Sequence, residues 1–329
     1  MLFPNKRAFV TGGTGFLGSY LVRGLLVRGW DVSTLVRTMN RARDLPPGAR
    51  GVPGDITKPE SLRAVMQGAD AVFHLAAQYE IGASEPERMW KINVEGTRAV
   101  LELAAELGVP KIVYTSTVAV YGMNREPVDE SFRAEGKKFS SEYERTKYAA
   151  HYEVAVPLQK NGAPIVIVCP GQVYGPGDTS QIGKMVELHL RGLLPVMIGP
   201  DNALTWAHAQ DIAEGHWLAY EKGAVGETYN LAGPAHTFKE FFETSQKVSG
   251  KRAPSIWIPG RWAGVVAHAL RPFNLPGMLS AELMTSLADI SYLASAEKAR
   301  RDLGWSPLSL EDGLREQAKW MSGWTERAL

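Results

Sequence analysis

Hydrophobic and polar positions alternate in a regular order through the first half of the chain. Short runs of consecutive apolar residues, rich in β-branched side chains, are separated by longer segments whose apolar residues recur at helical spacing. A strand that is apolar along its whole length is buried on both faces, which is typical of a parallel sheet covered by helices. We therefore predict parallel strands at 7–11, 31–36, 70–76, 111–116 and 164–171. The helices expected between them span 16–29, 61–68, 96–108 and 143–162.

The pattern changes after residue 169. Glycine and proline become frequent, and helical segments at 239–250, 295–304 and 309–321 follow without a repeating unit. We predict a dinucleotide-binding domain over 1–169. A smaller, mixed domain over 170–329 would bind the substrate and be partly interleaved with the first.

Composition narrows the class of function. The 36 basic and 35 acidic side chains nearly cancel and form no long run of one sign, so no nucleic acid or membrane partner is expected. Cys169 is the single cysteine, which excludes an intrachain disulfide and a cysteine-only metal site, and we predict a buried thiol and no metal. No apolar stretch reaches the roughly 18 residues of a membrane span, and the first residues do not resemble a signal peptide. A cytoplasmic protein is the expectation.

Residues 11–18, TGGTGFLG, join the first predicted strand to the first predicted helix. Glycines lack a Cβ, so backbone N–H groups in such a turn can approach a pyrophosphate at the positive end of the helix. The strand before and the helix after make the motif a specific signal of a Rossmann-type, doubly wound sheet with helices on both faces. We expect cofactor contacts from Gly12, Gly15, Phe16, Leu17 and Gly18.

The end of the second strand bears on the choice between NAD and NADP. An acidic residue there binds the ribose hydroxyl of NAD, whereas an arginine accommodates the phosphate of NADP. Arg37 occupies this position and is followed by Arg41 and Arg43. We predict NADP, with NAD as the alternative. A solvated basic loop is the non-functional interpretation.

Two further segments end strands at the same edge of the predicted sheet. Asp55 could accept a hydrogen bond from the adenine amino group, with Ile56 beside it, or could cap the helix that follows. His74 is expected to be a packed or capping histidine rather than a proton donor. The three residues after it are expected to contact the cofactor: Leu75, Ala76 and Ala77.

A tyrosine and a lysine four residues apart fall in the helix predicted over 143–162. Tyr143 and Lys147 would share one helix face, where the ammonium lowers the pKa of the phenol and makes proton exchange feasible near neutrality. The preceding strand ends in three hydroxyl residues, 115–117. Asn93 could hold a water or a backbone group that steadies the lysine. With a nicotinamide alongside, the tyrosine would pass a proton while the cofactor passes a hydride.

Taken in order, these segments resemble the extended (atypical) short-chain dehydrogenase/reductase family. The matching pieces span nearly the whole chain: TGGTGFLG, GDI, HLAA, NVEGT, YTSTVAVYG, YERTK and PGQVYGPGD. The resemblance implies a catalytic set of Thr117, Tyr143 and Lys147, with Asn93 in support. It also implies cofactor contacts from Ser116, Tyr143, Lys147, Pro170, Gly171 and Val173.

The same resemblance implies features outside the reaction centre. Family members often form homodimers through two helices per subunit, here 96–108 and 143–156. His208 and Asp211 are expected to be structural, with Asp211 capping the helix that follows.

The segment after the strand at 164–171 bears on the substrate. Many sugar-nucleotide enzymes of the family resemble R-x-x-N-V-Y-G-P here, and this chain has Cys169 for the arginine and Gln172 for the asparagine. The departure disfavours a sugar diphosphate, although Gln172 could still bond a phosphate oxygen. Gln172 and Thr117 are the expected substrate contacts. The segment 255–279 carries two tryptophans and could line an apolar pocket or form a core or dimer helix.

The residues and the resemblance leave three functions open. LVRTMNR and PGQVYGPGD look most like the dihydroflavonol-reductase-like and 3β-hydroxysteroid-dehydrogenase-like branch, which favours an NADP-dependent oxidoreductase of a small carbonyl or alcohol compound. The alternative is a nucleotide-sugar 4-epimerase or dehydratase with retained NAD, for which Arg191, Arg261 and Arg271 are candidate diphosphate ligands. A non-catalytic, cofactor-binding regulatory protein would have a broken Tyr-Lys pair, and here the pair is intact.

Overall fold

The computed structural model describes residues 6–79, 85–133, 139–270 and 290–325. Its centre is a seven-stranded sheet in the order β10-β6-β5-β4-β1-β2-β3, with every neighbouring pair parallel. The strand order reverses between β1 and β4, the position at which open α/β sheets bind ligands at their carboxyl edge. The strands are β1 (Arg7–Thr11), β2 (Asp31–Val36), β3 (Arg50–Pro53), β4 (Ala71–His74), β5 (Ile112–Thr115), β6 (Ile165–Pro170) and β10 (Thr228–Leu231).

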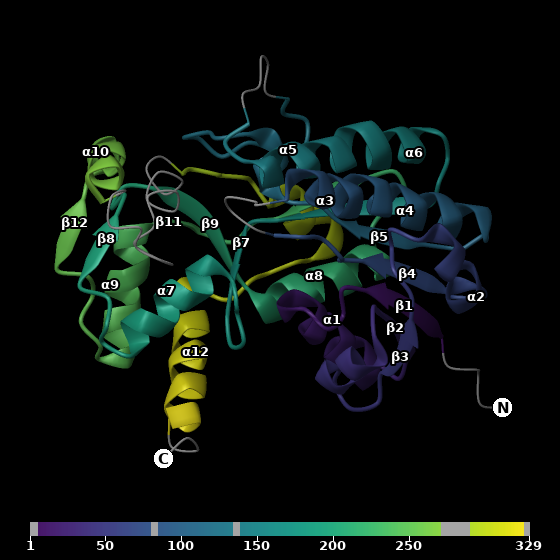
Figure 1. The fold of residues 1–329 in the computed structure, drawn as a ribbon, viewed down its shortest axis with the longest axis horizontal. Coiled ribbons are helices and arrows are strands. Elements are labelled where there is room, and N and C mark those ends of the chain that lie inside the picture. The colour runs from purple at the N-terminus through teal and green to yellow at the C-terminus, as the bar shows by residue number, and fades with distance from the viewer. Residues whose placement is uncertain (1–5, 80–84, 134–138, 271–289, 326–329) are drawn as a thin grey trace.

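Helices cover both faces of this sheet (Figure 1). One face carries α1 (Phe16–Val27) and α8 (Ala209–Glu221), which pack on each other. The other carries α3 (Pro86–Trp90), α4 (Gly96–Glu106), α5 (Glu142–Ala149) and α6 (Val156–Lys160). Short connecting helices are η1 (Met39–Asp44), η2 (Pro59–Ser61), α2 (Arg63–Met66), the π-helical η3 (Lys91–Glu95), η4 (Val118–Tyr121) and the π-helical η5 (Ala150–Ala155). None of the helices in the described ranges is both long and apolar enough to cross a bilayer.

The apolar runs of the sequence form the core of this layer. β4 and β6 are buried at every position because each lies between two strands and under helices on both faces. Cys169 in β6 is a free, buried thiol, as predicted, and burial raises its pKa to about 12. Removal of apolar surface from water stabilises such a core by about 25 cal/mol per Å².

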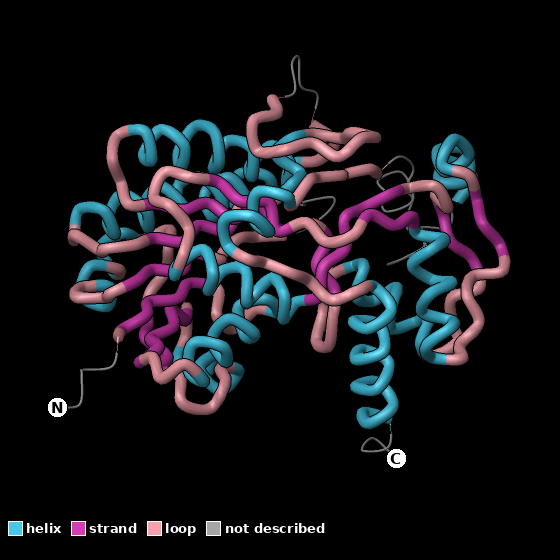
Figure 2. The backbone as a smooth tube through the Cα atoms, turned by 180° about the vertical axis from the view of Figure 1, so that it is seen from behind, coloured by secondary structure: helices cyan, strands magenta, loops and turns pink. Residues whose placement is uncertain are grey.

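A second group of strands lies beyond the large sheet along the long axis of the molecule (Figure 2). β7 (Gln172–Tyr174), β9 (Ala203–His208) and β11 (Ala235–Thr237) form a mixed sheet, and β8 (Val196–Ile198) pairs with β12 (Ile256–Ile258). The core of this region is aromatic, and the rings of Trp206 and Phe241 lie 4.1 Å apart. The remaining helices are α7 (Gln181–Leu190), α9 (Phe238–Ser249), α10 (Gly260–Leu270), the π-helical η8 (Ala299–Leu303) and α12 (Leu310–Thr325).

The chain passes between the two regions more than once. α8 lies on the large sheet and β10 forms its edge, although both follow residue 170. Leu303 and Trp305, near the C-terminus, belong to the core of the large sheet as well. A division at residue 170 therefore separates the chain by sequence but not by core.

Most of the predicted elements are present, with differences that have physical causes. All predicted strands form, whereas the helix expected over 61–68 is reduced to η2 and α2, and the one over 143–162 contains the π-helical η5. The hydrophobic pattern gave no bounds for β3 or β10, because both are short and carry polar residues. The segment 255–279 contributes β12 and α10, and its remainder after residue 270 lies outside the described residues.

Asp211 ties α8 to the C-terminal segment. The expectation that it caps α8 is wrong, because the N-cap is His208, whose Nδ1 accepts a 3.4 Å hydrogen bond from Gln210 N. The Asp211 carboxylate accepts from Leu308 N (2.9 Å), and its backbone carbonyl accepts from Trp305 Nε1 (2.8 Å). Burial raises the pKa of Asp211 to about 6, since the charged carboxylate is poorly solvated there.

This shifted pKa predicts how the stability of Asp211→Asn depends on pH. The folded protein holds the Asp211 proton to a higher pH than the unfolded chain, so the stabilisation from the protonated acid is lost as pH rises from about 4 through about 6. Asparagine keeps an oxygen for Leu308 N and does not ionise. Between pH 4 and pH 7, the free energy of unfolding of the variant should rise by about 1 kcal/mol relative to that of the wild type. This value is smaller than the full pKa shift would give, because Asp211 is only half-buried and solvent screens its charge.

Urea unfolding at a series of pH values would measure this gain. The exposed Asp201, changed to asparagine, serves as the control and should show no such trend. A stability difference between Asp211→Asn and the wild type that is independent of pH would contradict the prediction.

Candidate functional site

A cavity of about 690 Å³ opens at the carboxyl edge of the large sheet. The residues around it come from the turn after β1, the end of β2, the segments after β3 and β4, the α3–η3 helix and the last residue of β5. Eleven predicted cofactor residues line it: Gly12, Gly15, Phe16, Leu17, Gly18, Arg37, Asp55, Ile56, Leu75, Ala76 and Ala77. Parallel strands end at one edge of a sheet, and for this reason segments far apart in the sequence meet here.

The turn after β1 has no room for side chains. Gly12 has φ +80°, and a Cβ there would lie 2.8 Å from the backbone nitrogen of Ala76. A Cβ on Gly18 would collide with the carbonyl oxygen of Gly12. Gly15 N donates to Gly12 O (3.0 Å), and the N-cap of α1, Gly15, has no side chain to satisfy the first N–H groups of the helix. This cradle fits a pyrophosphate, because uncapped N–H groups and the positive end of the helix dipole face it.

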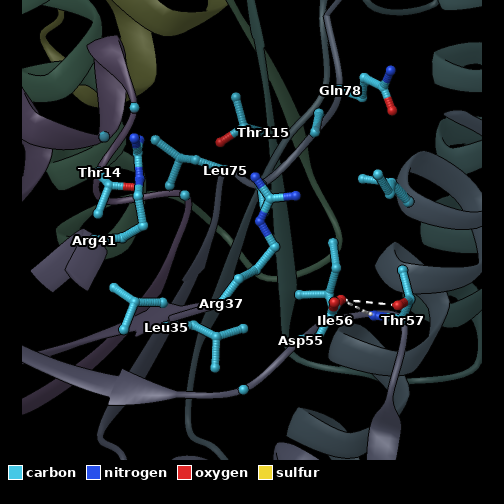
Figure 3. Close-up of a pocket in the computed structure, with 18 of the residues that line it drawn as sticks. Thr14, Leu35, Arg37, Arg41, Asp55, Ile56, Thr57, Leu75, Gln78 and Thr115 are labelled. Carbon is cyan, nitrogen blue, oxygen red and sulfur yellow. Dashed lines mark hydrogen bonds between the residues drawn. The ribbon is translucent and has the colours of Figure 1, made fainter. Parts of the chain in front are cut away.

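Two arginines approach the cavity from the end of β2 (Figure 3). The Arg37 side chain extends into the middle of the close-up, and Arg41 lines the cavity as well. Arg41 forms an ion pair with Asp44 at 3.1 Å, so its charge is partly balanced. Arg43 does not line the cavity, so the predicted cluster of three cations is reduced to two.

Asp55 lies on the wall opposite Arg41. Its Oδ1 accepts hydrogen bonds from Thr57 N and Thr57 Oγ1, both at 2.9 Å, and it does not cap the helix after it, whose N-cap is Lys58. Partial burial would raise the pKa of Asp55, but the bonds from Thr57 and the charge of Arg37 outweigh it and lower the pKa. Asp55 is therefore a carboxylate at neutral pH.

Several residues around the cavity were missed by the sequence analysis. Thr14, Val36, Gly54 and Thr57 adjoin predicted residues and follow from the same strand ends. Arg88, Lys91 and Ile92 also line the cavity from α3 and η3. No sequence motif indicates that these three residues lie at the cavity, because the packing of their helix against the sheet alone brings them there.

Tyr143 and Thr117 meet beyond the Thr115 end of the cavity. The Thr117 hydroxyl lies near enough to the Tyr143 phenol to act on its pKa, and the ring of Tyr79 stands edge-on to that of Tyr143 at 4.8 Å. Burial raises the pKa of the Tyr143 phenol, Tyr79 and Tyr292 add to the effect, and the Thr117 hydroxyl opposes it. The expectation that Lys147 lowers this pKa is wrong for the protein without cofactor, because the ammonium is directed elsewhere.

Lys147 lies one turn after Tyr143 on α5, as predicted, and is only 4% exposed. Its Nζ donates to Thr115 O at 2.8 Å and to Tyr114 Oη at 3.5 Å. Burial lowers the pKa of Lys147 to about 8, since an ammonium is poorly solvated there. The ammonium therefore lies against the end of β5, where Thr115 borders the cavity.

Asn93 does not steady Lys147 directly. Its Oδ1 accepts from Gln78 N (2.7 Å), and its Nδ2 donates to Gln78 O and to Thr146 Oγ1, both at 3.0 Å. Asn93 does hold a backbone group, as predicted, but this group is the backbone of Gln78, a residue that lines the cavity. Asn93 thus fixes a cavity wall to α5 through the π-helical turn η3.

His74 is a packed histidine, as predicted, and its tautomer follows from its partners. The Thr97 hydroxyl donates to Asn93 O (2.7 Å), so His74 Nε2 must donate to Thr97 Oγ1 (3.0 Å). His74 Nδ1 then accepts from Thr11 Oγ1 (2.7 Å). Burial lowers the pKa of His74 to about 3, and the charge of Lys147 adds to the effect, so the ring is neutral.

Five further predicted residues, besides Asn93, Thr117, Tyr143 and Lys147, do not line the cavity. The Ser116 hydroxyl is bonded to His151 Nδ1 at 2.8 Å and is buried, so its side chain is not available to a cofactor. Pro170 ends β6, and Gln172 and Val173 begin β7. Between them, Gly171 packs so closely on β9 that a Cβ would collide with Thr205 O. Gln172 Nε2 donates to its neighbour's carbonyl, Val173 O, at 3.1 Å.

The segment 255–279, for which an apolar pocket lining was one of the interpretations, does not line this cavity in its described part. Ile256 and Trp262 are 57% and 52% exposed. Of the candidate diphosphate ligands, Arg191 is paired with Glu187 at 2.7 Å, and Arg271 lies outside the described residues.

Comparison with known proteins agrees with this geometry. The model of a family described as the NAD dependent epimerase/dehydratase family matches residues 8–232. The chain is 32% identical to "Putative dihydroflavonol 4-reductase" of Synechocystis sp. over 95% of this chain and 93% of that protein. It is 33% identical to "3 beta-hydroxysteroid dehydrogenase/Delta 5-->4-isomerase" of Mycobacterium tuberculosis (strain ATCC 25618 / H37Rv) over 92% and 86% of the two chains. The crystal structure of gox2253 superposes with a TM-score of 0.83 and 31% identity, covering 97% of this chain and 98% of that one.

The bonds of Asn93 predict a structural cost for Asn93→Ala. The substitution leaves Gln78 N, Gln78 O and Thr146 Oγ1 without their buried partner. We expect a loss of about 2 kcal/mol in the free energy of unfolding, measured in urea. Asn161→Ala, at the exposed end of α6, is the matched control and should change stability by less than about 0.5 kcal/mol. An equal, small effect for both variants would contradict the role assigned to Asn93.

Proposed function

The chain belongs to the NAD dependent epimerase/dehydratase family, the extended short-chain dehydrogenases/reductases, and within it we propose an NAD(P)-dependent oxidoreductase. It would reduce a ketone or aldehyde to an alcohol, or oxidise that alcohol. The observation that carries the proposal is Tyr143 near Thr117, with the buried Lys147 one helical turn away, next to the glycine-lined cavity. The relatives named above, a reductase and a hydroxysteroid dehydrogenase, support a small apolar substrate.

The residues of the site suit proton delivery to a carbonyl oxygen. The bound nicotinamide would supply hydride to the carbonyl carbon, or accept it from the alcohol. Tyr143 would donate its phenolic proton to the oxygen, and the raised pKa keeps this proton in place at neutral pH. Thr117 would donate a hydrogen bond to the same oxygen, and Lys147 would hold the cofactor ribose with an N–H not used on β5. A protonated phenol is the form that reduction requires.

We further propose NADP as the preferred cofactor. Arg37 and Arg41 stand at the end of β2, where an acidic residue would be expected for NAD. Among the described residues that line the cavity, Asp55 is the one carboxylate, and it lies after β3 rather than after β2. The guanidinium groups would bind the phosphate of NADP through charge-assisted hydrogen bonds.

A nucleotide-sugar 4-epimerase or dehydratase is the second candidate, which the description of the family favours. It would use the same residues with tightly retained NAD. Two observations disfavour this candidate. Cys169, buried in β6, stands where many sugar-nucleotide enzymes of the family have an arginine. Arg191 is paired with Glu187, so fewer cations are left to bind a diphosphate. An epimerase should purify with its cofactor and give no net change in reduced nicotinamide. A homodimer through α4 and α5 stays a prediction.

Tyr143→Phe tests the proton donor. The variant keeps the ring and loses the phenolic hydroxyl, so we expect turnover of NADPH with a carbonyl substrate to fall by about 10³-fold while cofactor binding persists. The matched control is Tyr148→Phe, on the same helix but away from Thr117, which should retain activity. Tyr143→Phe with wild-type turnover would rule out the proposed role.

Arg37→Asp tests the cofactor. Fluorescence titration of the cofactor-stripped protein should show NADPH binding weakened by roughly 10- to 100-fold, with NADH little affected, because a charged hydrogen bond contributes about 1.5–3 kcal/mol. Arg43→Asp makes the same charge change on the same loop outside the cavity and should leave the preference nearly unchanged. Tighter binding of NADH than NADPH by the unmodified protein would overturn the NADP assignment.

A further inference from the structure

The ammonium of Lys147 is held by two consecutive residues of β5. Its Nζ lies 2.8 Å from Thr115 O and 3.5 Å from Tyr114 Oη. It also stands 5.1 Å from the centre of the Tyr114 ring, within the range of a cation–π contact. An ammonium has three N–H donors, so two are directed at β5 and one remains for a ligand.

Tyr114 is fixed in its position. The residue is 1% exposed, and its hydroxyl lies near the buried hydroxyls of Thr97 and Ser116. Its ring stacks on that of His74, with 5.7 Å between centroids and 20° between planes. Thr97 is hydrogen-bonded to His74 and to Asn93 O, so the surroundings of the Tyr114 hydroxyl are themselves fixed.

Other titratable groups face Lys147 from the surrounding elements, and none of those described here replaces this contact. His74 from β4 is neutral, and the Cys169 thiol from β6 has its pKa raised to about 12 by burial. Tyr143, on α5 itself, lies near Thr117, and burial raises the pKa of its phenol. Asn93, the residue expected to steady the lysine, is bonded to Gln78 and Thr146. Apart from the Thr115 carbonyl, the Tyr114 hydroxyl is the acceptor that stabilises the buried charge.

We propose that Tyr114 is a positioning residue for Lys147. Its fixed hydroxyl accepts a hydrogen bond from the ammonium, holds it at the carboxyl end of β5 and keeps it charged at neutral pH. A buried ammonium without such an acceptor loses its proton more easily, because burial penalises the charged form. The consequence for turnover rests on the proposed function, whereas the contact with Lys147 does not.

Tyr114→Phe isolates the hydroxyl, since phenylalanine keeps the ring that stacks on His74. We expect the pKa of Lys147 to fall by about 0.5–1 unit below its value in the wild type, because one acceptor of the charge is removed. The titration is followed by NMR of protein labelled with ¹³Cε-lysine, without cofactor or substrate, and the Lys147 signal is identified from its loss in Lys147→Arg. If the proposed function holds, the pH at which turnover declines on the alkaline side moves down by the same amount.

Tyr121→Phe is the matched control. Tyr121 is also 1% exposed, and its hydroxyl donates to Asn230 Oδ1 at 2.8 Å rather than accepting from Lys147. Tyr121→Phe should lower the free energy of unfolding without changing the pKa of Lys147. An unchanged Lys147 pKa in folded Tyr114→Phe, or an equal shift in Tyr121→Phe, would overturn the proposal.

A second variant covers the case in which Tyr114→Phe does not fold. Ser116→Ala removes one of the two hydroxyls near the Tyr114 hydroxyl and should shift the Lys147 pKa in the same direction by a smaller amount. No shift in that variant counts against the proposal. Absence of turnover with every carbonyl compound would refute the proposed function, and the lysine titration would still decide the role of Tyr114.

Discussion

The close approach of Gly12 to Ala76 is the constraint on which the rest of the site depends. β1 and β4 are parallel neighbours, so the turn after β1 must cross the end of β4, and a Cβ on Gly12 would lie 2.8 Å from Ala76 N. This contact brings α1 to the edge of the sheet with its uncapped N–H groups facing the cavity. The bond between Thr11 and His74 fastens the same two strands one residue earlier.

Charge is distributed unequally between the two ends of the site. Arg37, Arg41 and Asp55 surround the end near β2 and β3, where polar groups remain in contact with solvent. Beyond Thr115 the groups are phenols and hydroxyls, and Lys147 is a nearly buried cation among them. Burial therefore keeps Tyr143 protonated and makes Lys147 sensitive to each acceptor around it. Such an environment suits a neutral substrate at this end and an anionic cofactor at the other.

The hydrogen-bond network below the cavity connects these parts. Asn93 joins Gln78 to α5, and the carbonyl of Asn93 orients Thr97, which sets the tautomer of His74. The side chains of Asn93, Thr97, His74 and Thr146 are buried and hydrogen-bonded, which is the condition under which a polar core is specific rather than costly. The network explains why residues with no contact to the cavity can still determine the shape of its walls.

The sequence by itself determined the sheet, its covering helices and most of the cofactor cradle. The spacing of the apolar residues, the residues at the strand ends and the motif TGGTGFLG are all local signals. It also placed Tyr143 and Lys147 on one helix, since four residues make about one turn. Only the tertiary structure decided which partner each polar group takes: Asn93 binds Gln78, Lys147 binds Thr115 and Tyr114, and Ser116 binds His151. These partners depend on distances between strands and helices that are far apart in the chain, and no local sequence pattern encodes such distances. The same holds for Arg88 and Lys91, which line the cavity only because of the way their helix packs.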